Sequence, residues 1–239
     1  MVEPVRARDE EARRHRAERI LDAAAELLQR WGYKRTTIDD VAAEAGVGKG
    51  TVYLHWDTRE ALFEAVLVRE LLMVMEELLE AIRRDPEMAL LHRFSRLLFL
   101  ITVRRPLMLA LLTLDLDVLG QLAKQFDPAI EAGQRKAFKA YAALLREHGL
   151  VRADLSIDEL YYVFDATSNG FWFGETFTVG ASELAWERKA DLLETTLQRA
   201  FAPEGIPDVN VVREIAPRVV EIFGEFVNDY RARLRQVYA

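Results

Sequence analysis

The chain has 239 residues, of which 51% are hydrophobic, so it is long enough to bury a core in one large domain or two small ones. Its net charge of −7 argues against a surface that coats nucleic acid throughout, although a local basic patch remains compatible with it. The sequence has no cysteine, which excludes disulfides, thiolate zinc sites and cysteine nucleophiles and suits a reducing compartment.

The charged beginning of the chain, MVEPVRARDEEARRHR, lacks the apolar stretch of a secretory signal. The longest apolar runs, Leu97–Val103 and Pro106–Leu114, are far shorter than the roughly 18 residues that a membrane span requires. We therefore expect a cytoplasmic protein with no membrane partner.

Helical periodicity dominates the first 85 residues. The first predicted helix ends at Gly32 and is marked by apolar residues at three- and four-residue spacing: Ile20, Ala24, Leu27, Leu28 and Trp31. A short second helix begins at Thr37, which forms a predicted capping box with Asp40, and it ends at Gly46. A third helix is predicted from Gly48 to about Trp56. A fourth runs from near Thr58 to the Asp85-Pro86 break.

The remainder of the chain keeps the same helical pattern, without convincing strand alternation or internal repeats. The predicted helices are 88–104, 106–119, 127–148, 156–177, 182–201 and 210–237. Ser156 and Glu159 form a second predicted capping box at the start of one of them. We predict an all-α fold with an N-terminal three-helix unit over residues 1–60 and a larger helical body over residues 61–239.

The stretch AGVGKGTVYLHW, residues 45–56, looks at first like a phosphate-binding loop. A P-loop requires a glycine five positions before its Gly-Lys pair and Ser or Thr directly after the lysine, but Ala43 and Gly50 occupy those positions. The preceding segment is also helical in pattern instead of a strand. The sequence therefore argues against a nucleotide site.

A helix, a glycine-containing turn and a second helix are instead typical of the helix-turn-helix motif. Val52 and Trp56, four residues apart, predict the inner face of the second helix. Its predicted outer face consists of Lys49, Gly50, Thr51, Tyr53 and His55. Short helices with a glycine turn also occur in helical proteins that never bind DNA, so the geometry alone leaves both readings open.

The segment from about residue 13 to 65 resembles the signature of the tetracycline-repressor (TetR) family of transcriptional regulators. The most recognisable residues are Gly50-Thr51-Val52-Tyr53, the aromatic Trp56 and Arg59-Glu60-Ala61-Leu62. Two positions depart from the family pattern, which commonly has serine where Gly48 stands and phenylalanine where Trp56 stands. The resemblance implies an N-terminal DNA-binding domain, a helical ligand-binding and dimerisation domain, and no cofactor.

The resemblance also implies roles for matching residues. Thr37, Tyr53, His55 and Arg59 are expected to contact backbone phosphates. Lys49, Gly50 and Thr51 are expected to read bases. Lys34 and Arg35, which precede the second helix, are further phosphate candidates by sequence position alone. The expected partner is double-stranded DNA with a palindromic operator, bound by a homodimer.

For the body, the resemblance implies a small-molecule effector in an internal pocket and a four-helix dimer interface. We expect the interface to come from 156–177 and 182–201. The apolar stripe of 210–237 either joins that interface or docks on its own subunit. Candidate pocket residues are Phe94, Leu98, Met108, Leu112, Phe126, Tyr141, Tyr161, Phe164, Thr167, Ser168, Phe171 and Trp172, with Phe138 and Asn169 beside them.

Two other classes of function compete with a regulator. An enzyme is disfavoured because the four histidines show no metal-ligand spacing and no nucleophile motif is present, so we expect no catalytic residue and no metal site. A helical protein-binding adaptor without DNA binding is the main alternative. The sequence favours a ligand-responsive transcriptional repressor that an apolar or aromatic small molecule releases from its operator.

Overall fold

The computed structural model describes residues 3–124, 128–180, 183–203, 205 and 207–238, and its regular elements are helices. The N-terminal elements are α1 (Glu3–Trp31), α2 (Ile38–Glu44), α3 (Lys49–Tyr53) and α4 (Arg59–Arg84). The body adds the short 3-10 helix η1 (Pro86–Ala89), α5 (Leu91–Val103), α6 (Pro106–Leu112), α7 (Leu116–Leu119), η2 (Gly120–Lys124), α8 (Pro128–Glu147), α9 (Ile157–Phe177), α10 (Trp186–Phe201) and α11 (Val209–Tyr238). Across these ranges, no helix is both long and apolar enough to cross a bilayer.

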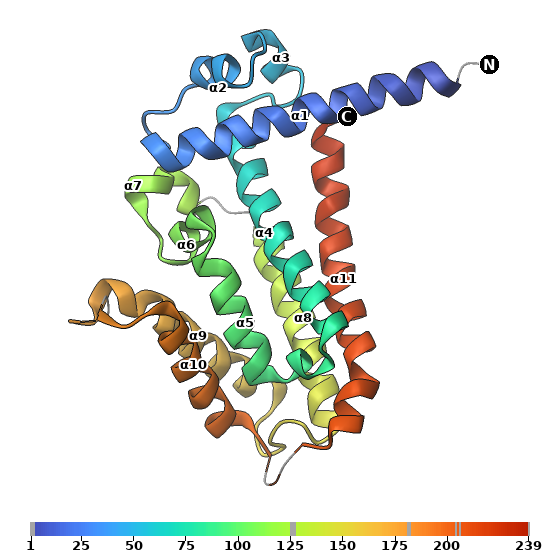
Figure 1. Ribbon diagram of the computed structural model, residues 1–239, viewed down its shortest axis with the longest axis vertical. Coiled ribbons are helices and arrows are strands. Elements are labelled where there is room, and N and C mark those ends of the chain that lie inside the picture. Colours follow the sequence, from blue (N-terminus) through green and yellow to red (C-terminus); the bar gives the residue numbers. More distant parts are fainter. Residues whose placement is uncertain (1–2, 125–127, 181–182, 204, 206, 239) are drawn as a thin grey trace.

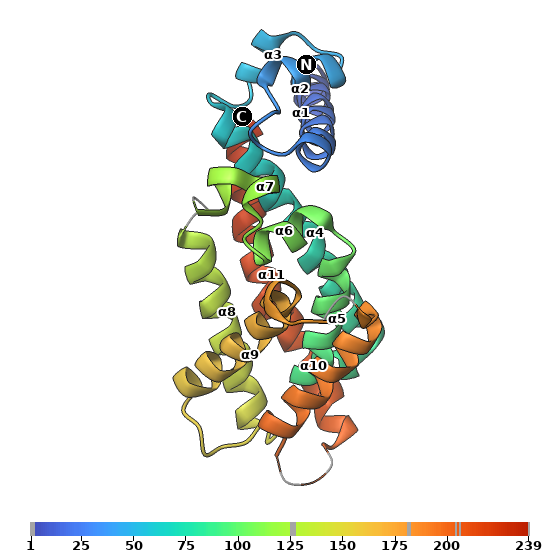
Figure 2. The same ribbon diagram turned by 90° about the vertical axis from the view of Figure 1, so that its left-hand side faces the viewer.

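The long helix α1 lies across one end of the molecule, and α2 and α3 sit on it (Figure 1). Helix α4 runs from this end into the body, where α11 packs along both α4 and α8. Figure 2 shows α9 between α8 and α10, and α10 packs on α5. The three N-terminal helices therefore form a head on an elongated helical body.

Side-chain caps begin several helices where the sequence predicts them. The Thr37 hydroxyl accepts from the Asp40 amide at 3.2 Å, while the Asp40 carboxylate accepts from the Thr37 amide at 2.9 Å. Ser156 and Glu159 make the same reciprocal pair at the start of α9. Both predicted capping boxes are confirmed. Each one satisfies amides that have no partner within the helix.

The predicted helix 106–119 is interrupted, and this prediction is wrong in its centre. Leu114 has a left-handed φ of 51° between α6 and α7. The Asp115 carboxylate accepts from the amides of Asp117 and Val118 at 2.9 and 3.1 Å, so it starts a new helix instead of continuing the old one. Aspartate is favoured at helix N-caps over helix interiors because its side chain bonds to nearby backbone amides. A pattern of apolar residues does not show where such a cap interrupts a helix.

Two helices also begin later than predicted. The segment predicted as 88–104 starts with the 3-10 helix η1, and α5 proper begins at Leu91. The segment predicted as 182–201 becomes α10 only at Trp186. The C-terminal ends of both segments agree with the prediction to within one residue.

The end of α1 corrects one predicted core residue. Trp31 is 43% exposed, with the Arg30 guanidinium 5.9 Å from its ring centre, whereas Leu27 and Leu28 are buried. The apolar stripe of α11 is buried within the same chain against α4 and α8: it contains Val219, Phe223, Phe226, Val227, Tyr230 and Leu234. Of the two alternatives for this stripe, docking on its own subunit is confirmed.

Candidate nucleic-acid interface and ligand cavity

A tight turn places α2 and α3 against each other. Gly46 adopts a left-handed φ of 64°, which glycine tolerates without steric cost. The Val47 amide donates to the Ala42 carbonyl at 2.9 Å, and the Val47 side chain packs on the core. The arrangement of two short helices about a glycine turn is that of a helix-turn-helix.

The two faces of α3 differ sharply. Val52 on α3 and Trp56, which follows the helix, are at most 1% exposed and anchor α3 to the head. Lys49 and Gly50 are exposed, and Tyr53 is 43% exposed on the opposite side. Apart from Gly50 itself, its two chain neighbours and the backbone of its own helix, no atom of the described residues lies within 4 Å of where a Cβ on Gly50 would stand, so the outer face is open there to a close-approaching surface. This outer face is the candidate base-reading surface.

Lys49 already has a partner on α2. Its ammonium lies 2.8 Å from the Asp39 carboxylate, and this hydrogen-bonded contact raises the pKa of Lys49. Both side chains are more than half exposed, so the ion pair contributes little to stability and exchanges readily. Lys49 can therefore leave Asp39 for a nucleic acid at small cost.

The N-terminus of α2 is also partly occupied. The Asp40 carboxylate takes both the amide and the hydroxyl of Thr37, and these bonds lower the pKa of Asp40. A phosphate at Thr37 would compete with this carboxylate. Lys34 and Arg35 are exposed just before α2, and the described structure shows no ion pair for either.

The predicted exposure of His55 is wrong. This residue is 6% exposed, and its ring lies 5.4 Å from that of Trp56. Burial lowers the pKa of His55, and the positive charges of Arg13 and Arg16 lower it further. The helix ends at Tyr53, and the chain then turns inward, so a face extrapolated from helical periodicity fails at residue 55.

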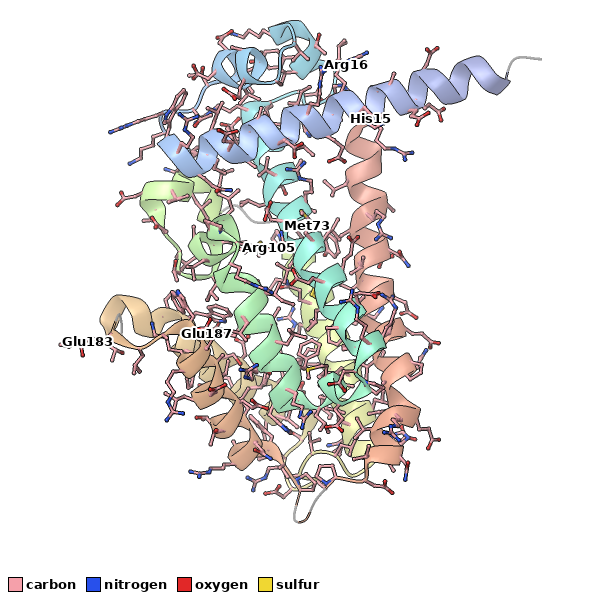
Figure 3. The ribbon with its side chains drawn as sticks, viewed as in Figure 1. His15, Arg16, Met73, Arg105, Glu183 and Glu187 are labelled. Atoms are coloured by element: carbon pink, nitrogen blue, oxygen red, sulfur yellow. The ribbon has the colours of Figure 1, made fainter. Side chains whose placement is uncertain are left out.

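Arg13 and Arg16 are neighbours of α3 that the sequence-based prediction missed. The Arg13 guanidinium donates to the Leu54 carbonyl at 3.4 Å, and Figure 3 shows Arg16 on the side of α1 toward α3, with His15 on the other side. A spacing of three residues places both arginines on one face of α1. That spacing was the available signal, because no motif marks them.

The expected phosphate contact Arg59 has a different set of partners. Its Nε donates to the Thr36 carbonyl at 2.9 Å, and an Nη donates to the Tyr33 carbonyl. The guanidinium also stacks 3.9 Å from the centre of the Tyr33 ring. Arg59 therefore holds the segment that leads into α2, which is a positioning role that the sequence did not indicate.

A second contact joins this segment to the body. The Tyr33 amide donates to the Val118 carbonyl at 2.8 Å, and the Tyr33 hydroxyl donates to the Glu60 carboxylate at 2.8 Å. Gly32 packs so closely on α7 that a Cβ there would lie 2.6 Å from the Asp117 carbonyl oxygen. The link between α1 and α2 thus rests on α7 as well as on α4.

The body contains a largely apolar cavity of about 320 Å³. It lies among α4, α5, α6, α8, α9, α10 and α11. Eight of the residues predicted for a pocket line it: Phe94, Leu98, Met108, Leu112, Tyr161, Phe164, Ser168 and Trp172. Phe138 and Asn169 line it as well.

Three described residues among those predicted for the pocket do not line this cavity. Tyr141 is fully buried beside it, where its hydroxyl donates to the Ala89 carbonyl at 2.7 Å and burial raises its pKa well above the usual range. Thr167 and Phe171 lie on α9 outside the lining, and Phe126 lies outside the described residues. Tyr141 is thus a core residue, because its polar atom is already satisfied by the backbone.

The sequence-based prediction missed the polar residues of α8 and α9 that line the cavity. Gln134, Arg135 and Asp165 all border the cavity. Helical spacing could have found Asp165, since it lies four residues after Tyr161 and four before Asn169 on the same face. No pattern in the sequence shows that α8 packs against α9, so the sequence did not indicate that Gln134 and Arg135 border the cavity.

Comparison with known proteins agrees with this geometry. Residues 20–66 match the profile of the bacterial regulatory proteins of the tetR family. The chain is 41% identical over 64 residues to the uncharacterized HTH-type transcriptional regulator YhgD of Bacillus subtilis (strain 168), a match that covers 26% of this chain and 34% of that protein. The chain thus spans about a third of the length of this relative.

Solved structures are similar over most of the chain. The SmeT–triclosan complex superposes with a TM-score of 0.61 at 20% identity, covering 82% of this chain and 96% of SmeT. The transcriptional regulator FadR from Bacillus subtilis, in complex with stearoyl-CoA, superposes with a TM-score of 0.59 at 17% identity, covering 75% and 96%. At such identities these likenesses establish the fold. With the family's profile matched at residues 20–66 and a helix-turn-helix head on a helical body, the N-terminal segment of this chain is similar to the bacterial regulatory proteins of the tetR family.

Proposed function

We propose that this protein is a transcriptional repressor that binds a palindromic operator as a homodimer and leaves it when a small apolar or aromatic molecule binds. Residues 1–60 would bind DNA, and residues 61–239 would hold the effector and the dimer interface. The observation that carries the proposal is the two-sided helix α3, anchored inward by Val52 and Trp56 and open outward at Lys49, Gly50 and Tyr53.

Contacts to DNA are expected around that open face. Lys49, Gly50 and Thr51 are proposed to read bases in the major groove. Thr37, Lys34, Arg35, Tyr53 and the newly found Arg13 and Arg16 are proposed to contact backbone phosphates. His55 and Arg59 are not in this set, because His55 is buried and Arg59 is engaged with two carbonyls.

A gel-shift titration with genomic fragments tests DNA binding directly. Affinity is expected to fall steeply as salt rises, because phosphate contacts release counterions from the DNA. Equal affinity in low and high salt, or no shift with any fragment, would favour the helical adaptor instead.

Base reading and phosphate binding predict different mutant behaviour. Thr51→Ala is expected to relax the base preference at one or two operator positions, at a cost of about 1–3 kcal/mol on the preferred sequence. Arg35→Ala is the contrasting variant. We expect it to weaken binding to all operator sequences alike and to reduce the slope of log affinity against log salt concentration by about 1. Binding-site selection with randomised operators measures both. If Thr51→Ala lost the same affinity for every operator sequence, Thr51 would belong to the phosphate contacts.

The outer face of α9 supports the dimer proposal. Tyr162 is 72% exposed and Val163 is 38% exposed, although both are apolar or aromatic residues in the middle of the body. Large apolar side chains left in water on one helix commonly mark a protein interface. We propose that α9 and α10 pack against their copies in a four-helix interface.

Tyr162→Arg is therefore expected to convert the protein to a monomer, because it places two like charges across a two-fold axis. Analytical ultracentrifugation gives the mass directly. The control is Asn210→Arg, an exposed position at the start of α11, which should leave the dimer intact. A dimeric Tyr162→Arg protein would move the interface away from this face of α9.

The cavity supports an effector role because its walls connect to the head by two routes. On α6, Met108 and Leu112 line the cavity. At the start of α6, Arg105 lies 3.5 Å from Glu70 and 3.3 Å from Glu77 of α4, and it donates to the Met73 sulfur at 3.8 Å, a neighbour relation visible in Figure 3. A displacement of α6 would therefore also move α4 through the contacts of Arg105.

The second route runs through α7, which follows α6 and holds the Tyr33 amide through Val118. An effector that favours a different position of α6 would alter both supports of the head. The resulting change in operator affinity is limited by the effector's differential affinity for the two states, typically about 1–3 kcal/mol. Equal operator affinity of the ligand-bound and free protein would contradict this coupling.

A further inference from the structure

Among the described residues, the side-chain hydrogen-bond donors still free to meet a ligand lie on one side of the cavity. On α5, the hydroxyls of Ser95 and Thr102 donate to the carbonyls of Leu91 and Leu98 at 2.7 and 2.8 Å, so their donors are already used. On α9, the buried Ser168 hydroxyl has no partner among the described residues. The side-chain donors free to meet a ligand therefore lie on the side of the cavity formed by α8 and α9.

Asp165 is the charged group on this side whose charge is least compensated. Its carboxylate accepts from the Asn169 amide at 3.0 Å, and the described structure shows no ion pair for it. Arg135 also borders the cavity but is directed to Glu131, at 3.9 Å. Asp165 is an exposed residue at the border of the cavity; its partial burial, followed by the repulsion of Glu131, raises its pKa, while the Asn169 amide lowers it. One positive and two negative side chains thus leave an excess negative charge here.

Aromatic rings line the same cavity as this carboxylate. The rings of Phe138 and Phe164 stack with centroids 4.3 Å apart, and the Tyr161 ring lies 5.5 Å from Phe138. All three rings line the cavity together with Asp165. The face of an aromatic ring attracts a cation, most strongly where water is excluded. A carboxylate beside several rings suits a substituted ammonium group.

The remainder of the cavity is apolar. Its other lining residues include Leu71, Val74, Met75, Leu111, Leu193 and Phe226. We propose that the effector is a cationic amphiphile, whose positively charged nitrogen lies against Asp165 and the neighbouring rings while its hydrocarbon part fills this apolar end. The proposal rests on the effector role of the cavity and specifies the class of molecule.

Other ligand classes fit these groups less well. An anionic head would face Asp165 and Glu131, with only the shared Arg135 to offset them. A neutral molecule could fill the apolar end but would leave the Asp165 carboxylate without a counter-charge.

Three ligands with the same tail and different heads test the proposal: octyltrimethylammonium, octanol and octyl sulfate, titrated calorimetrically into the full-length protein. We expect octyltrimethylammonium to bind about tenfold more tightly than octanol, the ratio that about 1.4 kcal/mol gives. Octyl sulfate should bind most weakly. Binding of octyl sulfate as tight as that of octyltrimethylammonium would overturn the proposal.

Two variants locate the preference. Asp165→Asn should remove most of the advantage of the cation without changing octanol affinity, and Tyr161→Leu should reduce that advantage while keeping the carboxylate. Glu214→Gln, at an exposed position on α11 outside the cavity, makes the same change in net charge and should alter neither affinity. A cation preference that survives in Asp165→Asn overturns the role of Asp165.

Operator release separates this proposal from the proposed function. If all three ligands bind equally and release the operator, the cavity is an effector site but the cation proposal fails. If none binds while DNA binding remains intact, the effector role of the cavity fails, and the cation proposal with it. Selective release by octyltrimethylammonium supports both.

Discussion

Replacing Gly32 with alanine is expected to lower the free energy of unfolding by about 3 kcal/mol. Gly32 has a φ of +74°, which is costly for any residue with a side chain. The new Cβ would also stand 2.6 Å from the Asp117 carbonyl oxygen, a backbone atom that moves only if α7 moves. Urea unfolding followed by circular dichroism measures the loss.

Gly46→Ala is the matched control for this prediction. Gly46 has a similar φ of +64°, but apart from Gly46 and its two chain neighbours no atom of the described chain lies within 4 Å of the position that its new methyl group would take. In this variant the free energy of unfolding should fall only by the cost of a left-handed φ for a residue with a side chain, about 1 kcal/mol. Equal losses in the two variants would mean that α7 does not press on Gly32.

Arg59→Ala is expected to reduce both stability, by about 2–3 kcal/mol, and operator affinity on every sequence. Two carbonyls, those of Tyr33 and Thr36, lose their donor, and the Tyr33 ring loses its stacked cation. The start of α2 would then be held less firmly, and DNA binding would suffer through that displacement. Thermal unfolding and gel-shift titration report the two effects separately.

Arg59→Lys separates positioning from phosphate binding. Lysine keeps the charge that a phosphate contact needs, but it cannot reproduce two donors in a planar fork stacked on a ring. We therefore expect it to resemble Arg59→Ala in both measurements. A stable lysine variant with normal operator affinity would return Arg59 to the phosphate contacts.

The features that could be predicted from the sequence are those set by neighbouring residues. The capping box of Thr37 and Asp40, the turn at Gly46 and the buried pair Val52 and Trp56 depend on interactions within a few positions of the chain. Such local signals act before any tertiary packing and survive in the folded protein.

The failures come from contacts between distant segments or from helix ends. Helical periodicity places His55 on an outer face only if it extends past Tyr53, where α3 in fact ends. Arg59 binds carbonyls more than twenty residues earlier, a pairing that no spacing rule contains. Asp165 and Arg135 line the same cavity because α8 and α9 pack together, which depends on the whole fold.

The contact between Tyr33 and Val118 has a practical consequence for protein engineering. Because the head and the body are separate parts of the chain, a modular biosensor could be built by grafting the head of one protein onto the body of another. A junction near residue 60 would cut through no helix-turn-helix residue, yet it would remove the Asp117–Gly120 surface on which Gly32 and Tyr33 rest. A working chimera of this head should therefore carry its own α7 with it.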